Sequence, residues 1–256
     1  NWTQMLFLGI FLVDIALDRV ALPRRIALKL LLRVGVDKPS VVLALFMAVA
    51  WVLSMFTSSI AATLMLCPFA TGLLNAAEER AADAADTAAA DTESGAPSES
   101  AAGDAGKAAK PLGRFSSGVL LGIAFGAGAG GIATVIGTPT NGILLGQPML
   151  AGSGLNFSSW VAFGLPISAA VGLLALSVLL ASYTHGAGIP LKREVLEEAQ
   201  ERLLAEDGPA GRDEAVVGAV ALLQLLLLLV EPWVIGPIVT NMAGITLENS
   251  SVIACL

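Results

Sequence analysis

The sequence is poor in charged residues and in the side chains that most enzyme and metal sites use. Only 14% of the 256 residues are charged and a single histidine is present, whereas soluble domains carry about 25% charged residues. This composition excludes a nucleic-acid-binding protein, a disordered tail and an ordinary cytosolic enzyme. Cys67 and Cys255 both lie in apolar runs, so they provide neither a disulfide framework nor a zinc site. With one histidine and no Gly-x-Ser-x-Gly motif, an intramembrane hydrolase is a weak hypothesis.

Long apolar runs take the place of the missing charges. Hydrophobic residues make up 55% of the chain and the mean hydropathy is +0.79. Residues 39–77 contain no charged residue, and residues 115–191 contain only the near-neutral His185. A helix needs about 20 apolar residues to cross a bilayer. The first run is thus long enough for two crossings or one re-entrant hairpin, and the second for three crossings, or two with interruptions. We expect an all-α, polytopic integral membrane protein of the plasma membrane or an organelle membrane.

The positions of the basic residues predict the orientation in the membrane. Six basic residues lie between residues 19 and 38, which places this region on the cytoplasmic side by the positive-inside rule. Within it, residues 26–33 form a short amphipathic segment suited to the membrane interface, with Lys29 and Arg33 four residues apart on its wet side. A second polar stretch, residues 186–213, also fits a cytoplasmic surface helix or loop. An even number of crossings between residues 115 and 191 agrees with both placements.

Residues 76–110 differ in kind from the rest of the chain. Fifteen of these 35 residues are alanine, eight are acidic and three are basic, and none is Val, Ile, Leu, Phe or Trp. Such a segment cannot bury enough apolar area to offset the entropy of ordering, so after a turn or two of helix we expect a flexible acidic loop. The net charge of −7 is concentrated here.

The apolar and polar stretches divide the chain into five segments: 1–75 (membrane helix, interfacial helix and re-entrant hairpin), 76–112 (acidic, Ala-rich flexible loop), 113–185 (broken helix and following transmembrane helix), 186–213 (polar cytoplasmic segment) and 214–256 (transmembrane helix and the start of a second half).

Polar residues interrupt the apolar runs at residues 54–60 and 126–141. The first interruption is rich in Ser and Thr, and the second contains several glycines together with Pro139 and Asn141. Small residues in membrane helices usually serve close packing, and Ser or Thr often bonds back to its own helix, but packing requires neither the proline nor the asparagine. Non-helical backbone at membrane depth is tolerated where it lines a cavity or is buried in protein. Half-helix N-termini there stabilise anions, whereas carbonyls and hydroxyls bind a cation such as sodium.

Both interruptions resemble the divalent anion:sodium symporter family, also called the sodium:sulfate/dicarboxylate symporters. That family carries Ser-Asn-Thr within a run such as S-M-W-I-S-N-T-A-T-T-x-M-M-x-P, and residues 54–68 here are S-M-F-T-S-S-I-A-A-T-L-M-L-C-P. The family then has G-G-x-A-T-x-I-G-T-P-P-N in a broken helix, and residues 130–141 here are G-G-I-A-T-V-I-G-T-P-T-N. The similarity covers most of residues 1–185 apart from the acidic segment.

The chain begins at Asn1 without a methionine and stops within an apolar run, so we expect a fragment that lacks both ends.

The resemblance implies a transporter and not an enzyme. The implied fold is one half of an inverted-repeat transporter, with a re-entrant helical hairpin, a broken helix and an elevator-type motion, in a homodimer. The implied activity is sodium-coupled symport of divalent anions, first of all dicarboxylates such as succinate, malate or citrate. Its partners would be the small anion, sodium and the lipid bilayer. By the same resemblance, the sodium ligands would be Ser54, Ser58, Ser59 and Gly137. The substrate contacts would be Ser59, Ile60, Thr138, Pro139 and Asn141.

Two departures from the family pattern keep other functions open. Ser59 stands where the family has Asn, and Ile60 where it has Thr. A serine keeps a hydroxyl, but an isoleucine offers no side-chain hydrogen bond, and a site built on hydrogen bonds loses heavily when a partner is missing. Related phosphate carriers have a run like S-N-V-A-A here. The alternatives are therefore a sodium symporter of sulfate or phosphate and a non-transporting membrane relic. Backbone amides at the hairpin tip could still bind either a dicarboxylate or an inorganic anion.

Overall fold

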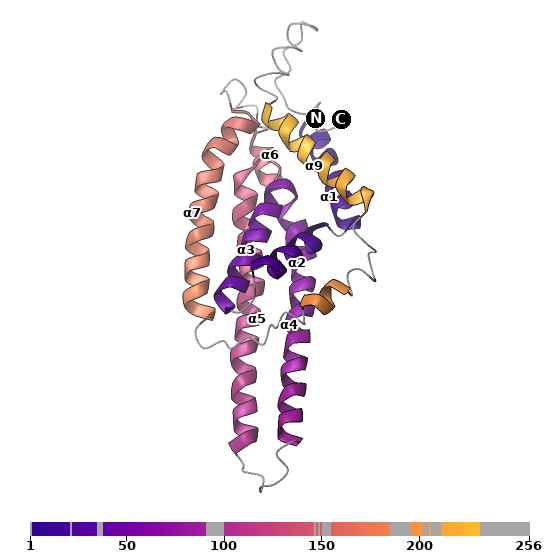
Figure 1. Cartoon of the computed structure of the whole chain (residues 1–256). Coiled ribbons are helices and arrows are strands. Elements are labelled where there is room, and N and C mark those ends of the chain that lie inside the picture. The colour runs from indigo at the N-terminus through magenta and orange to yellow at the C-terminus, as the bar shows by residue number, and fades with distance from the viewer. Residues whose placement is uncertain are drawn as a thin grey trace, which may run out of the picture.

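The structure, a computed structural model, describes residues 2–20, 22–34, 38–90, 100–145, 147, 149, 155–184, 196–201, 205 and 211–230. Within these ranges the regular structure is helical and no strand occurs (Figure 1), which confirms the all-α prediction. The principal helices are α1 (Trp2–Arg19), α2 (Leu22–Val34), α3 (Pro39–Phe56), α4 (Ser59–Ala90), α5 (Ser100–Ala133), α6 (Pro139–Leu145), α7 (Phe157–Tyr183) and α9 (Arg212–Val230).

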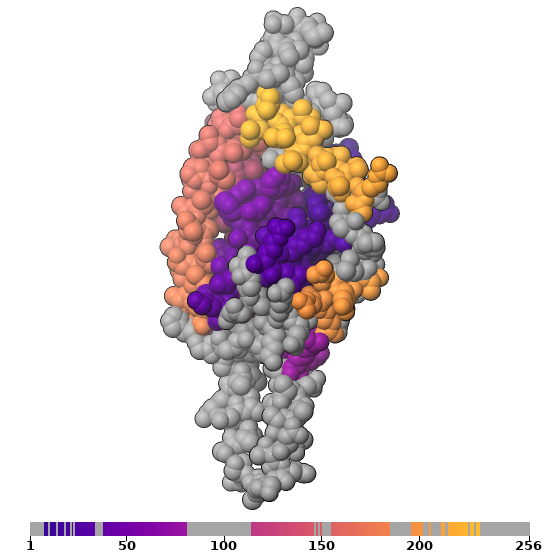
Figure 2. Space-filling model, in the orientation of Figure 1, coloured from indigo at the N-terminus to yellow at the C-terminus, as the bar shows by residue number. Residues whose placement is uncertain are grey.

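Four helical stretches are long and apolar enough to cross a membrane: α3, Ser59–Arg80 of α4, Arg114–Ala133 of α5, and α7. Even the 18 residues of α3 extend about 27 Å at 1.5 Å per residue, close to the roughly 30 Å of a bilayer's hydrocarbon core. The chain is therefore a polytopic integral membrane protein. Between residues 115 and 191, two long helices enclose the short α6, as expected for two crossings with an interruption. Helix α9 holds a shorter apolar stretch, Ala215–Gln224, and lies against α1 and α7 (Figure 2).

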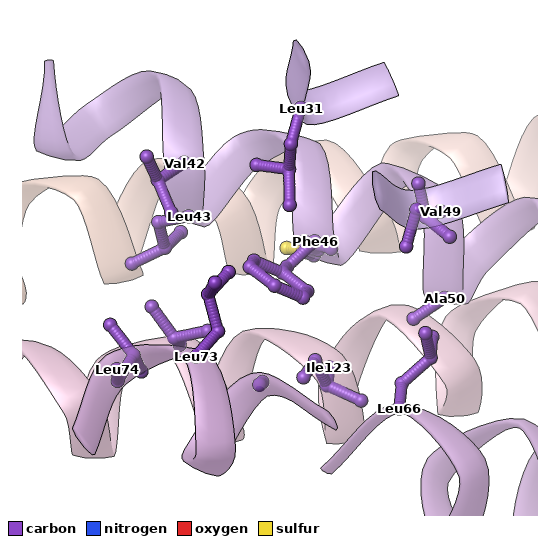
Figure 3. Packing of buried hydrophobic residues seen from close by; sticks show 14 of the residues in the cluster. Leu31, Val42, Leu43, Phe46, Val49, Ala50, Leu66, Leu73, Leu74 and Ile123 are labelled. Carbon is purple, nitrogen blue, oxygen red and sulfur yellow. The ribbon is translucent and has the colours of Figure 1, made fainter. Parts of the chain in front are cut away.

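Helices α2, α3, α4 and α5 share one apolar core. Phe46 of α3 is buried, and its ring lies 6.2 Å from that of Phe69 on α4. Leu31 of α2 and Ile123 of α5 join the same cluster (Figure 3). Because lipid tails are as apolar as these side chains, close van der Waals packing stabilises such a cluster in a membrane. The packing holds α3 and the beginning of α4 firmly against α5.

Helix α2 turns an apolar face to the core and exposes two of its basic residues on the opposite side. Leu28 and Leu31 are buried in the core, whereas Lys29 and Arg33 are exposed. The helix contacts α3 and α4 through its buried face. This separation is the one expected for an amphipathic helix lying at the membrane interface.

Glycines on α5 bring its backbone next to that of α3. A Cβ atom on Gly126 would overlap the carbonyl of Met47, and one on Gly130 would overlap the carbonyl of Trp51. Close approach of two membrane helices needs small residues at such positions. The packing interpretation of these two glycines is thus confirmed. The consequence for the site is that the C-terminal ends of α3 and α5 lie side by side.

Helix α7 is joined to the same pair of helices by buried polar contacts. Its Ser168 accepts a hydrogen bond from Nε1 of Trp51 on α3 at 2.8 Å and donates to the Ala129 carbonyl of α5 at 2.5 Å. Nε1 of Trp160 donates to the Ile132 carbonyl at 3.1 Å. The helix begins at Asn156, whose side chain and backbone form a capping box with Ser159.

The acidic segment differs from its expected structure. Helix α4 continues to Ala90 and α5 already begins at Ser100, so much of the predicted loop is helical. In Figure 1 the two helices extend together beyond the other elements at the lower end of the view. The physical reason is the alanine content, because alanine is the best helix former. Residues 91–99 of the expected loop lie outside the described residues.

The polar segment after α7 is described only in part. Residues 196–201 are helical, and the side chain of Leu196 is buried in the common core. Glu198 forms an ion pair with Arg80 of α4. The expected surface helix is therefore present over these residues, whereas residues 186–195 lie outside the described part. The same holds for residues 231–256, which include most of the expected segment 214–256.

Candidate functional site

The first interruption separates α3 from α4 by only two residues. The backbone of Thr57 is extended (φ −120°, ψ 168°), and both its N–H and its hydroxyl donate to the Leu53 carbonyl, at 2.9 and 3.0 Å. Ser58 then caps the N-terminus of α4, because its carbonyl accepts from the Ala62 N–H at 2.9 Å and its Oγ accepts from the Ile60 N–H at 3.3 Å. A serine in this role is a typical helix N-cap. The chain reverses here, and the hydroxyls of Thr57 and Ser58 both bond to nearby backbone groups.

The second interruption lies between α5 and α6. The N–H of Gly137 donates to Oγ1 of Thr134 at 3.0 Å. Nδ2 of Asn141 donates to the Gly131 and Thr134 carbonyls, both at 2.8 Å. These are carbonyls at the C-terminal end of α5, which have no helical partner of their own. Asn141 therefore caps α5, and Pro139 begins α6 at the position where a missing N–H costs nothing.

The two interruptions contact each other directly. The N–H of Ser59, the first residue of α4, donates to the Gly137 carbonyl at 3.0 Å. The Thr134 hydroxyl donates to the Met55 carbonyl at 2.8 Å, and the Ser54 hydroxyl donates to the Ala127 carbonyl at 2.6 Å. Three hydrogen bonds thus join residues more than 70 positions apart in the sequence. The structure brings the two polar runs of the sequence into one site.

Two glycines make this approach possible. A Cβ on Gly137 would lie 2.7 Å from the Gly131 Cα and carbonyl and 2.7 Å from the Ser54 carbonyl. A Cβ on Gly131 would lie 2.6 Å from Cγ2 of Thr138 and 3.4 Å from the Cβ of Ser59. The side chains of Thr138 and Ser59 therefore lie close to each other, beside Gly131.

The expected site residues differ in exposure. Ser54, Ser58 and Gly137 are buried, whereas Ser59 and Thr138 are half-buried, as are Pro139 and Asn141. Ile60 is 64% exposed. The expected cation ligands therefore lie deeper than the expected anion contacts, and the two groups meet at Ser59.

The backbone amides at the start of α4 are mostly engaged. The Ser59 N–H is bonded to Gly137, and the Ile60 N–H to Ser58. Among the described residues of this first turn, the Ala61 N–H is the one without a hydrogen-bond partner. An anion at the tip would therefore depend on side-chain hydroxyls and on the helix dipole more than on a cluster of free amides.

The chemistry of the site is that of neutral oxygen atoms. In the part of the chain that the structure describes, no group of three or more His, Cys, Asp or Glu residues could hold a metal ion. Hydroxyl and carbonyl oxygens surround the contact between the two interruptions instead, and unwound backbone carbonyls of this kind coordinate sodium in transporters. In addition, α3 and α5 both end here, and helix C-termini favour cations. The donor set fits a sodium ion.

Two residues that belong to the site were not identified from the sequence. Thr134 and Gly131 both lie within the quoted run 130–141, but neither was assigned a role. Thr134 bonds to both interruptions, and Gly131 provides the space beside Ser59 and Thr138. The available signal was a threonine and a glycine placed next to a helix break, where a hydroxyl can replace a lost backbone bond.

Gly131→Ala tests the contact beside Gly131. The added methyl group would overlap Cγ2 of Thr138, so we expect a lower unfolding temperature for the purified protein in detergent. Thr138→Ser removes that Cγ2, and in the Gly131→Ala background it should restore part of the loss. A double-mutant cycle is expected to give a coupling energy of roughly 0.5–3 kcal/mol, as for residues in contact. Strictly additive effects would contradict the contact.

Comparison with known proteins identifies the family. The family model described as citrate transporter (CitMHS) matches residues 2–254. The chain belongs to this citrate transporter family. It is 33% identical over 190 residues to solute carrier family 13 member 2 of Oryctolagus cuniculus, which covers 64% of this chain and 32% of that protein. It is 29% identical over 164 residues to the sodium-dependent dicarboxylate transporter SdcS of Staphylococcus saprophyticus, covering 63% and 27%.

A third relative agrees with the first two. The SdcS protein of Staphylococcus aureus is 26% identical over 182 residues, which is 70% of this chain and 31% of that protein. The matched part of the chain thus spans about a third of the length of these relatives. Membership of the citrate transporter family, with sodium-dependent dicarboxylate transporters among the relatives, confirms the resemblance to the divalent anion:sodium symporters.

Proposed function

We propose that this citrate-transporter-family chain forms part of a sodium-coupled symporter of divalent anions, with dicarboxylates such as succinate, malate or citrate as its first substrates. The observation that carries the proposal is the contact of two interrupted helices through the Ser59 N–H and the Gly137 carbonyl. Interrupted helices meeting in this way supply oxygen ligands and helix termini in one place. The name of the two SdcS relatives, sodium-dependent dicarboxylate transporter, supports both the anion and the ion.

In this proposal the sodium ion binds at the deeper part of the contact. Its ligands would come from the hydroxyls of Ser54, Ser58 and Ser59 and from the carbonyl of Gly137. The Ser54 hydroxyl donates its proton to the Ala127 carbonyl, so its oxygen lone pairs can turn toward a cation. The C-terminal ends of α3 and α5 add a favourable field for positive charge.

The anion would bind at the more exposed part, next to the sodium ion. Cγ2 of Thr138 and the Cβ of Ser59 both lie beside Gly131, and the hydroxyls of these two residues would both donate to a carboxylate. The N-terminal end of α4 favours negative charge. Asn141 uses its amide nitrogen to cap α5, so it would offer only its amide oxygen. Ile60 and Pro139 would contribute apolar contact.

The rest of the proposed transporter follows the family resemblance. A second, inverted half would complete the anion site, and α3 with α4 would form a re-entrant hairpin. Sodium would strengthen the contact between the two interruptions, because it draws oxygens from both. The anion would then be carried by a rigid-body movement of these helices in a homodimer.

Symport of an inorganic anion is the second candidate. It is favoured by the exposed Ile60 side chain, which offers no hydrogen bond where the family has a threonine. Sulfate or phosphate is one compact anionic group, whereas a dicarboxylate needs hydrogen-bond donors at two separate carboxylates. A non-transporting relic is the third candidate, and it is motivated by the same loss of the family's Asn and Thr.

Uptake of labelled succinate separates these candidates. Cells expressing the full-length gene are expected to take up succinate in sodium buffer and not in choline buffer, with unlabelled citrate competing. Sodium-dependent uptake of sulfate or phosphate without succinate uptake would instead support the inorganic-anion symporter. No uptake of any of these anions, by protein shown to reach the membrane, would support the relic.

A further inference from the structure

We propose that Thr134 is a positioning residue of the cation site, and that its hydroxyl fixes the backbone of Gly137. The inference rests on the proposed function, in which the Gly137 carbonyl is a ligand of the coupling cation. It assigns a role to a side chain that is not itself among the proposed ligands.

The Thr134 hydroxyl links the two interruptions from a buried position. Oγ1 donates to the Met55 carbonyl, in the last turn of α3, at 2.8 Å. The same oxygen accepts from the Gly137 N–H at 3.0 Å. A hydroxyl has one proton to donate and two lone pairs, so this single group can satisfy both backbone partners. No apolar side chain can replace it.

The backbone of Gly137 needs such a restraint. A glycine has more conformational freedom than any other residue, and the space around Gly137 admits no Cβ that could limit it. Its N–H is held by Thr134, and its carbonyl accepts from the Ser59 N–H at 3.0 Å. With both ends of the residue bonded, the carbonyl oxygen keeps one direction toward the hairpin tip. Removing the Thr134 hydroxyl releases one of these two ends.

Loss of the Thr134 hydroxyl is expected to weaken the binding of sodium more than the binding of the anion. The Met55 carbonyl and the Gly137 N–H would both lose a buried partner, and the Gly137 carbonyl would no longer be held in place. The Thr134 hydroxyl bonds to Met55 and Gly137 and not to the proposed anion contacts, Ser59 and Thr138. We therefore expect that loss of the hydroxyl lowers the affinity for sodium more than the affinity for the anion. An unsatisfied buried group corresponds to about tenfold or more in an equilibrium constant.

The test is Thr134→Val in the full-length protein. Valine keeps the shape of threonine and removes the hydroxyl. The sodium concentration for half-maximal succinate uptake should rise about tenfold, while KM for succinate at saturating sodium stays within about twofold. A second readout is the rise in unfolding temperature of the purified protein on adding sodium, which should need correspondingly more sodium.

Three further variants make the result specific to the hydroxyl. Thr134→Ser keeps the hydroxyl and should restore the wild-type sodium dependence. Thr71→Val removes a hydroxyl that bonds only within α4, and it should leave the sodium dependence unchanged. If Thr134→Val does not reach the membrane, Thr134→Cys should shift the sodium dependence in the same direction, because a thiol is a weak donor and acceptor.

The outcomes distinguish this inference from the proposed function. Sodium-dependent uptake by the wild type, with an unshifted Thr134→Val or an equally shifted Thr134→Ser, would overturn the role of Thr134 and leave the proposed function standing. A wild type whose uptake and unfolding temperature are both insensitive to sodium would overturn the two together. A shift in Thr134→Val and its recovery in Thr134→Ser would support the role.

Discussion

Gly137→Ala is expected to lower sodium-dependent uptake strongly. The added Cβ would lie 2.7 Å from three backbone atoms, two of Gly131 and one of Ser54. Real Cβ atoms do not approach other atoms so closely, and backbone cannot move aside as the end of a flexible side chain can. The two interruptions would have to separate, at a cost of roughly 1–3 kcal/mol or more. Because the Gly137 carbonyl would leave Ser59, uptake should fall by about tenfold or more.

The matched control for this variant is Gly128→Ala on α5. Apart from the neighbouring backbone of α5 itself, no atom lies within 4 Å of the place that a Cβ on Gly128 would take, and alanine is the better helix former by up to about 1 kcal/mol. Uptake and unfolding temperature should therefore equal or exceed those of the wild type. Both variants are compared at equal amounts of protein in the membrane. Wild-type uptake by Gly137→Ala would show that the two interruptions do not meet as the structure has them.

The positions of the helix breaks could be predicted from the sequence. Pro139 and Asn141 do not belong inside an apolar crossing, and the serines near residue 58 interrupt a run without charge. Local sequence carries these signals because a break depends on residues that weaken the helix at that point. The structure has both breaks at these places.

The pairing of the two breaks could not be predicted from composition or periodicity. Ser59 and Gly137 are far apart in the sequence, and what brings them together is the packing of α5 glycines against the backbone of α3. The role of Thr134 depends on that pairing, because one of its partners is in α3. Such contacts are properties of the tertiary arrangement. The resemblance to a family pointed to the right segments, but not to these bonds.

Residues 76–110 contain more helix than the sequence analysis predicted. That prediction weighed the lack of apolar residues, which argues against a packed core. It gave too little weight to the alanines, which favour helix without any core. Helices α4 and α5 also enter this segment already formed, and extending a helix is much easier than starting one. Described helix therefore reaches Ala90 from one side and begins at Ser100 on the other.

Asn141→Asp should destabilise the site, although it changes only one atom of the side chain. Nδ2 of Asn141 donates to the carbonyls of Gly131 and Thr134, both at 2.8 Å and both in buried residues. Two acceptors at this distance fix which end of the amide is the nitrogen. A carboxylate would place a negative oxygen against two carbonyl oxygens and leave both without a donor, at roughly 1–3 kcal/mol each. The unfolding temperature should fall by about 5 °C or more.

Asn156→Asp is the same substitution with the opposite expectation. Oδ1 of Asn156 accepts from the Ser159 N–H and from the Ser158 hydroxyl, both at 2.9 Å, at the start of α7. Aspartate keeps this acceptor and adds negative charge at a helix N-terminus, where it is favourable. Its unfolding temperature should be unchanged or higher. Equal behaviour of the two variants would contradict the assigned direction of the Asn141 amide. A difference in the expected direction would mean that the Asn141 amide nitrogen is not free to donate to a bound carboxylate, which leaves the hydroxyls of Ser59 and Thr138 as the donors of the proposed anion site in this chain.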